Sequence, residues 1–279
     1  MALPDVLTPY ADLEEVLAEL LEQWRRILGD DLVGAYVQGS FALGGGDQHS
    51  DCDWLVATRS SLTGPQLPQL RALHNEIPTR DGPWQDLEGS YAPVEELTSA
   101  EHLGRTWLFN DHGHRTFVWN DHCNRAYTRW ILRENGITLT GPAPRSFMLV
   151  VPAAALRREA AASLPTLLDD LAPWIDIDID IDTDTDTVAW GQRYAVVTAC
   201  RTLYTLETAQ VAASREHWSG RCARSRGGGS RSWRRSATNA TSGGIPDRPT
   251  RDGEADAARN LVGYVRARAG QADAFEQRS

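Results

Sequence analysis

Lysine is absent from this sequence of 279 residues, and all 28 basic side chains are arginine. Any role that requires the compact ammonium group of lysine must therefore be filled by arginine or left empty. Cysteine is scarce, since Cys52, Cys123, Cys200 and Cys222 lie far apart and form no C-x-x-C pair. This spacing argues against a disulfide or zinc framework and predicts free thiols in a reducing cytosol.

Long apolar runs and known nucleotide-binding loops are also missing. No apolar run reaches the length of a membrane span and no signal peptide opens the chain, so we expect a cytoplasmic protein without a membrane partner. The glycines form neither a G-x-G-x-x-G fingerprint nor a G-K-[ST] P-loop. The net charge of −10 argues against nucleic acid as a partner and suits a cationic substrate.

One stretch, at and between two apolar runs, contains the residues that point to a chemical function. The first run, residues 33–37, predicts a buried strand that ends at Gly39 and Ser40. A glycine-rich loop follows, and Asp51 and Asp53 then open a second apolar strand. Because strand side chains alternate, the two aspartates are expected on one face, where their carboxylates repel each other.

A divalent cation relieves that repulsion, and Mg²⁺ prefers carboxylate oxygens together with the phosphates of a nucleotide. Gly39 allows the backbone to approach a phosphate closely, and the Ser40 hydroxyl can donate to it. The structural alternative is a glycine-rich hairpin in which Asp51 and Asp53 only cap a turn.

The order of Gly-Ser, a loop, Ser-Asp-x-Asp and an apolar strand resembles the signature of the DNA polymerase β-like nucleotidyltransferase superfamily. The resemblance implies an α/β (α+β) fold, a mixed sheet with covering helices, followed by an all-helical C-terminal domain. It also implies that Gly39, Ser40 and Ser50 contact a nucleotide and that Asp51 and Asp53 bind Mg²⁺.

The superfamily places a third carboxylate on the strand beside Asp-x-Asp, where it deprotonates the attacking hydroxyl. Residues 84–92 predict that strand, and Asp86 and Glu88 share one of its faces. Glu88 is our choice for the base and third metal ligand, since its Leu-Glu context resembles that of the aminoglycoside adenylyltransferases. Asp86 is the second choice, and two ordinary solvent-facing strand residues are the structural alternative.

Three further segments either match the family or depart from it. Residues 133–142 resemble the segment that closes the catalytic domain of streptomycin-type adenylyltransferases. Relatives often have a nucleotide-binding aspartate at Asn124, which cannot contribute charge. Residues 199–208 resemble the helix that supplies a phosphate-binding arginine in aminoglycoside 3''-adenylyltransferases, which implies this role for Arg201; a buried ion pair is the alternative. Relatives follow that helix with a nucleotide-binding lysine, and Arg215 is the nearest basic residue here.

Apolar periodicity sets the expected organisation. It predicts helices over residues 12–28, 69–75, 125–135, 153–171, 190–211 and 254–269. A catalytic domain is expected over 1–145 and a helical, cleft-closing domain over 146–279. The His-rich stretch 110–124 has no zinc spacing and predicts a polar connection beside the nucleotide.

Two stretches depart from the family. Residues 175–187 form an aspartate dipeptide repeat, which predicts a mobile loop that attracts a polycation without specificity. Residues 212–251 lose helical periodicity and are rich in Arg, Ser and Gly, which indicates either a natural disordered insertion or compensating frameshifts.

The sequence therefore predicts a Mg²⁺-dependent enzyme that transfers AMP from ATP to a hydroxyl of an aminoglycoside and so confers antibiotic resistance. A non-catalytic or degenerate nucleotidyltransferase-like protein, such as an antitoxin-type partner, is the alternative. An adenylyltransferase that modifies proteins is a third candidate.

Overall fold

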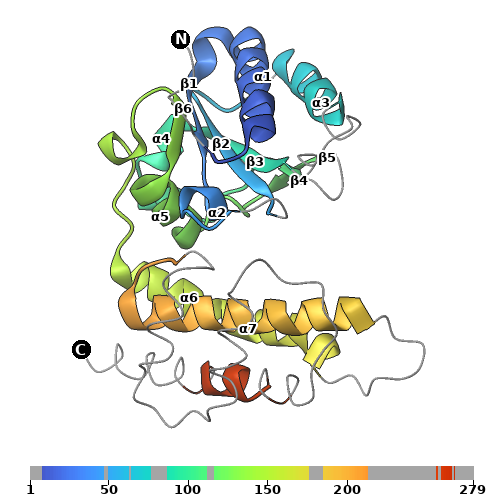
Figure 1. Ribbon diagram of the computed structural model, residues 1–279. Coiled ribbons are helices and arrows are strands. Elements are labelled where there is room, and N and C mark those ends of the chain that lie inside the picture. The colour runs from blue at the N-terminus through green and yellow to red at the C-terminus, as the bar shows by residue number, and fades with distance from the viewer. Residues whose placement is uncertain are drawn as a thin grey trace. The chain divides into compact units, whose positions relative to one another are not determined.

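The computed structural model describes residues 8–46, 50–62, 64–76, 87–111, 116–175, 185–212, 256, 259–265 and 267 (Figure 1). The chain divides into two compact units, Met1–Val151 and Pro152–Ser279. Four predicted features lie wholly or largely outside the described residues: Asp86, Arg215, the aspartate repeat and the segment 212–251.

The first unit is built on a mixed six-stranded sheet. Its strands are β1 (Leu32–Val37), β2 (Cys52–Thr58), β3 (Leu87–Pro93), β4 (Trp107–Asp111), β5 (Thr116–Asn120) and β6 (Ile137–Thr140). They are arranged in the order β5-β4-β3-β2-β1-β6. Only β2 and β3 pair in parallel, and the other neighbours are antiparallel. The α+β fold with a mixed sheet, predicted from the resemblance, is confirmed.

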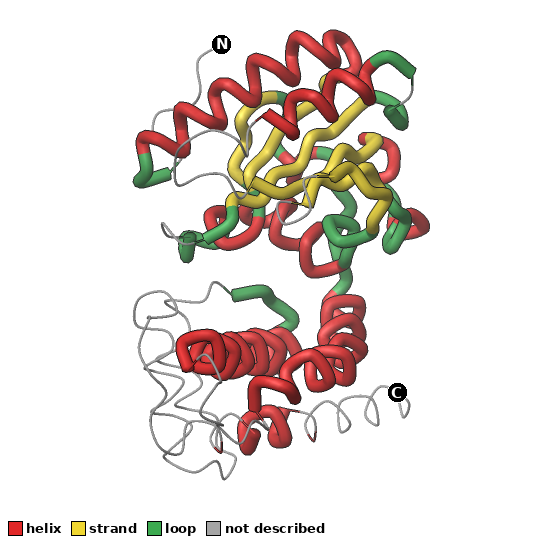
Figure 2. Tube along the Cα trace, turned by 90° about the vertical axis from the view of Figure 1, so that its right-hand side faces the viewer, coloured by secondary structure: helices red, strands yellow, loops and turns green. Residues whose placement is uncertain are grey.

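Helices lie on both faces of this sheet (Figure 2). The helices of the first unit are α1 (Ala11–Leu28), α2 (Gly39–Ala42), α3 (Gln66–Glu76), α4 (Val94–Leu97) and α5 (Ala126–Asn135), with short 3-10 turns at Gly29–Asp31, Ala100–His102 and Pro144–Ser146. Helices α1 and α3 pack on one face, while Leu97 of α4 and Leu132 of α5 belong to the core on the other face. The predicted helices 12–28, 69–75 and 125–135 correspond to α1, α3 and α5.

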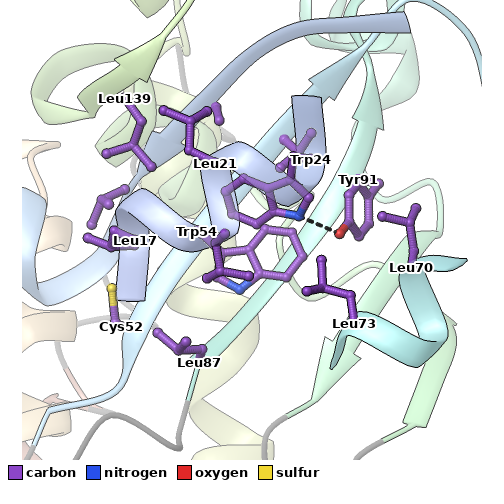
Figure 3. Packing of buried hydrophobic residues seen from close by; sticks show 14 of the residues in the cluster. Leu17, Leu21, Trp24, Cys52, Trp54, Leu70, Leu73, Leu87, Tyr91 and Leu139 are labelled. Carbon is purple, nitrogen blue, oxygen red and sulfur yellow. Dashed lines mark hydrogen bonds between the residues drawn. The ribbon is translucent and has the colours of Figure 1, made fainter. Parts of the chain in front are cut away.

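The core under α1 and α3 is aromatic and contains a buried polar chain (Figure 3). Trp24 Nε1 donates to the Tyr91 hydroxyl at 2.7 Å, and that hydroxyl lies 2.7 Å from His74 Nε2. The His74 ring stacks on Trp54 with 5.1 Å between ring centroids. Burial lowers the pKa of His74 to about 3, so the ring is neutral and Nε2 can accept the Tyr91 proton.

Strand alternation separates this core from the opposite face. Cys52, Trp54 and Val56 of β2 point into the core under α1 and α3. Leu55 and Ala57, which alternate with them along the strand, pack into the core with α5. The same alternation turns Asp53 toward the α5 face.

The prediction of a polar connection over residues 110–124 is wrong in part, because the stretch also contains residues of two strands. Strands β4 and β5 occupy residues 110–111 and 116–120 of it, and Asn110 pairs with Phe117 across them. The buried Asn110 side chain donates from Nδ2 to the Leu87 carbonyl at 3.0 Å. The strands were not predicted because this stretch contains many polar residues. A polar side chain is nevertheless compatible with a buried strand when a neighbouring strand supplies its hydrogen-bond partner.

The segment 133–142 forms the end of α5 and the edge strand β6, which pairs with β1. Tyr36 donates from its hydroxyl to the Pro142 carbonyl at 2.9 Å. Gly141 has φ +92°, and a Cβ there would lie 2.4 Å from the Val33 carbonyl oxygen. Glycine at this position therefore lets the chain leave the sheet edge in close contact with β1.

The second unit contains two long helices, α6 (Ala153–Ile175) and α7 (Thr185–Thr208). Arg157 Nε of α6 donates to the Leu206 carbonyl of α7 at 3.0 Å. Residues 259–265 are helical, with Leu261, Val262 and Val265 buried as their spacing predicted. No helix among the described residues is long and apolar enough to cross a membrane.

Candidate active site

The parallel pair of strands brings two predicted carboxylates together. The β2–β3 register places Asp53 directly opposite Glu88, on the same face of the sheet. Their side chains hydrogen-bond when one of them carries a proton. Burial, then the charge of Glu88 and to a smaller extent that of Asp51, raise the pKa of Asp53 above its usual range. The pair therefore resists full ionisation without a cation.

Gly39 fixes the start of the glycine-rich loop against Asp53. Its φ is +64°, and a Cβ there would lie 1.8 Å from Asp53 Oδ2. The preceding residue, Gln38, donates its backbone N–H to the Asp53 carbonyl at 2.8 Å. Only glycine fits so close to the carboxylate, and Ser40 follows it in the first turn of α2.

Asp51 and Ser50 lie outside the strand. Strand β2 begins at Cys52, so the alternation expected for Asp51 and Asp53 does not govern the position of Asp51. Asp51 is exposed and Ser50 is partly buried. Among the described residues, no group of three or more His, Cys, Asp or Glu side chains is placed to hold a metal ion. Two of the three predicted ligands, Asp53 and Glu88, lie side by side, and their role as metal ligands stays a prediction.

Two residues near Glu88 were missed by sequence reasoning. His122 Nε2 lies 3.5 Å from Glu88 Oε1, and this contact is the largest cause that raises the pKa of His122. Asp111 also raises it, through its charge. Gly89 pairs with Asn110 across β3 and β4, and continuing this antiparallel register by one pair places Asp111 beside Glu88. No local pattern marks either residue, because the register of β3 and β4 brings Asp111 to Glu88 and the turn after β5 brings His122 there.

Asn124 is completely buried and bonded to the protein. Its Oδ1 accepts from Arg129 Nε at 2.7 Å, and its Nδ2 donates to the carbonyls of His102 at 2.7 Å and Arg105 at 2.8 Å. An amide serves this position well because a carboxylate could not donate to the two carbonyls. In this structure Asn124 stabilises the 102–105 loop, and its contact with a nucleotide stays a prediction.

Arg129 is a buried arginine that sequence reasoning did not single out. It is 1% exposed, its guanidinium lies 5.3 Å from the centre of the Trp107 ring, and Nη1 donates to the Ser99 carbonyl at 2.9 Å. Burial lowers its pKa to about 10, so the group stays charged at neutral pH. Arg129, together with Asn124, anchors the loop that precedes β4.

The remaining predicted phosphate ligands belong to the second unit. Arg201 lies on α7, partly buried and beside the buried residues Cys200 and Thr202. Arg215 lies outside the described residues. Contacts from either arginine to a nucleotide stay predictions.

Comparison with known proteins supports the fold. No protein-family model matches the sequence, and no curated protein matches it. Among solved structures, the chain is similar to spectinomycin adenyltransferase AAD(9) from Enterococcus faecialis, whose structure was determined with ATP and spectinomycin. The similarity has a TM-score of 0.63 at 14% identity and covers 92% of this chain and 98% of that one. The chain thus has the fold of an adenyltransferase.

Proposed function

We propose that this protein transfers AMP from ATP to a hydroxyl group of an aminoglycoside-like, cationic acceptor. The observation that carries the proposal is the placement of Asp53 opposite Glu88 on parallel strands, with Gly39 pressed against the Asp53 carboxylate. The fold shared with an adenyltransferase that binds ATP and spectinomycin supports the same class of reaction. Modification of such an acceptor would confer antibiotic resistance.

The donor chemistry of the site fits Mg²⁺. The two carboxylates repel each other, and burial together with this repulsion raises the pKa of Asp53. A divalent cation bound between them would relieve this repulsion. Asp53 and Glu88 would hold the ion, Asp51 is the third predicted ligand, and phosphate oxygens and water suit its remaining positions. When bound, the ion neutralises the charge that develops on the phosphates.

Glu88 is the proposed general base. The acceptor hydroxyl oxygen bonds to the α-phosphorus of ATP, the bond from that phosphorus to the leaving pyrophosphate oxygen breaks, and the hydroxyl proton passes to Glu88. A positioned base contributes roughly 10²- to 10⁴-fold to such a reaction. Gly39, Ser40, Ser50 and Arg201 are proposed to orient the phosphates, which supplies rate through positioning.

The charge of the chain favours a cationic acceptor. The net charge is −10, and the register of β3 and β4, continued by one pair beyond Gly89 and Asn110, places Asp111 beside Glu88. Ammonium groups on the acceptor would be drawn toward such a site, most strongly at low ionic strength. Aminoglycosides carry several ammonium groups beside several hydroxyls, and so match both requirements.

Pyrophosphate release tests the proposal directly. Purified protein with Mg²⁺ would be incubated with each nucleoside triphosphate and a panel that includes streptomycin, spectinomycin and neutral sugars, and mass spectrometry would score addition of one AMP to the acceptor. We expect ATP-dependent modification of at least one cationic acceptor, and none with Asp53→Asn. Release of pyrophosphate that requires no acceptor, or modification of a protein instead, would reject the aminoglycoside assignment.

A further inference from the structure

His122 sits in a turn whose backbone is held by its neighbours. The His122 N–H donates to Asn120 Oδ1 at 2.8 Å, and the Asn124 N–H donates to the Asp121 carbonyl at 2.8 Å. Arg125 pairs with Asp121 at 2.9 Å across the same turn. A turn restrained at both ends directs its side chain with little freedom.

The imidazole of His122 is held between a ring and a carboxylate. Its ring lies 5.2 Å from the Phe109 ring at an interplanar angle of 34°, and Phe109 itself is buried. The His122 side chain is 50% exposed, whereas the Glu88 side chain that it contacts is 14% exposed. His122 therefore covers a more buried carboxylate.

Glu88 has a neighbour on each side. Asp53 lies opposite it on β2, and His122 Nε2 lies 3.5 Å from Oε1. A carboxylate that reacts with a hydroxyl needs one oxygen tied in place and the other presented to the substrate. Hydrogen bonds of catalytic groups are often long before substrate binds and shorten in the reacting complex.

We propose that His122 is a positioning residue, whose Nε2–H holds one oxygen of Glu88 so that the other faces the acceptor hydroxyl. This proposal rests on the proposed transfer reaction, since it gives Glu88 its orientation in that reaction. His122 does not touch the reacting atoms and acts through Glu88. The same arrangement, a second residue that orients the first, recurs wherever a catalytic group must be held precisely.

Three variants separate hydrogen bonding from packing. His122→Phe keeps the ring on Phe109 and removes the donor, and His122→Gln keeps a donor and removes the ring. Asp121→Asn is the control: it weakens only an exposed ion pair of the same turn, keeps the two hydrogen bonds of the turn backbone and does not touch Glu88. We expect His122→Phe to lower kcat by roughly 10- to 100-fold, since small misplacements of reacting groups have effects of this size. KM for ATP should stay within about twofold, because the lost interaction acts in the transfer step.

Recovery by the conservative variant is the decisive readout. His122→Gln should regain most of the kcat that His122→Phe loses, and Asp121→Asn should match the unsubstituted protein. A purely structural role would instead make kcat follow thermal stability across all three variants. An unchanged kcat in His122→Phe, or equal losses in the Phe and Gln variants, would overturn the proposal.

A measurement without turnover separates this proposal from the proposed function. His122→Phe, Glu88→Gln and the double variant would be compared in urea unfolding, where contacting residues give non-additive shifts of the midpoint. We expect non-additivity, and additive shifts would overturn the contact on which positioning depends. If the unsubstituted protein modified no acceptor, the transfer reaction would be rejected, and this cycle would still decide whether His122 holds Glu88.

Discussion

The two faces of the sheet in the first unit come from the same strands and have opposite chemistry. Under α1 and α3, Trp24, Tyr91 and His74 form a neutral, buried hydrogen-bonded chain among aromatic rings. Figure 3 shows its first link, from Trp24 to Tyr91. On the other face Asp53 and Glu88 repel each other. One residue step along β2 or β3 changes a side chain from one environment to the other. The first face therefore only stabilises the unit, whereas the second combines an apolar core with a pair of carboxylates whose repulsion costs stability.

The largest expected effect comes from replacing Asp53, the carboxylate whose charge is unfavourable on this face of the sheet. Asp53→Asn should lower transfer by roughly 10³-fold or more, since it removes a proposed metal ligand and phosphate charge compensation. The same change should raise the melting temperature of the Mg²⁺-free protein by a few degrees, because it removes a repulsive buried charge.

Pyrophosphate release and thermal unfolding, each with and without Mg²⁺, measure both effects. Asp30→Asn is the matched control, because Asp30 is exposed and outside the site. We expect Mg²⁺ to raise the melting temperature of the unsubstituted protein and of the control, and to leave Asp53→Asn unchanged. Near-normal turnover in Asp53→Asn would contradict the metal assignment.

Glu88→Gln should slow transfer by roughly 10²-fold or more while ATP binding stays nearly intact, as expected for loss of a general base. Single-turnover rates and calorimetric ATP titration would separate the two. Asp86→Asn is the comparison variant, since Asp86 was the second choice for the base. A large loss with Asp86→Asn and none with Glu88→Gln would move the base to Asp86.

Gly39→Ala should reduce transfer by roughly 10- to 100-fold, because the new methyl group would displace the Asp53 carboxylate by an ångström or more. Gly64→Ala is a well-matched control: Gly64 has φ +63°, almost the same as the +64° of Gly39, and open space around its Cβ position. Both variants should lose about 1–2 kcal/mol of stability from the left-handed backbone. Equal activity in the two variants would show that the close approach to Asp53 is unimportant.

The smallest effect on activity is expected from the stabilising face. Tyr91→Phe removes the acceptor for Trp24 and the donor for His74, and should cost about 1–3 kcal/mol of unfolding free energy with little change in kcat. Urea unfolding and steady-state kinetics would measure this contrast, with Tyr36→Phe as a second hydroxyl deletion on the other face. A large fall in the kcat of Tyr91→Phe, measured where this variant is fully folded, would show that the two faces are coupled.

Local pattern predicted a substantial part of the site. The apolar run before Gly39 and the run after Asp53 correspond to β1 and β2, and the strand of Glu88 corresponds to β3. The first two segments were recognisable because their apolar residues are consecutive, and the strand of Glu88 was sought because the superfamily places a third carboxylate beside Asp-x-Asp. Asp51 was predicted on the same strand face as Asp53. Because β2 begins at Cys52, Asp51 lies outside the strand and strand alternation does not determine its direction.

The remaining residues could not be found from local pattern. Strands β4 and β5 were missed because each has only three consecutive apolar residues, so the neighbourhood of Glu88 and Asp111 could not be predicted. His122 and Arg129 have no sequence neighbours that mark them. Each is defined by a partner far along the chain, Glu88 for His122 and Ser99 for Arg129.

The sequence by itself determined which side chains can do chemistry and on which kind of element they stand, because hydrophobic periodicity and backbone propensity act within a few residues. Only the tertiary structure decided which of them meet. The parallel register of β2 and β3 aligns Asp53 with Glu88, and the turn after β5 delivers His122 to the same carboxylate. Such meetings depend on hydrogen bonds and packing between distant segments, and no local pattern in the chain encodes them.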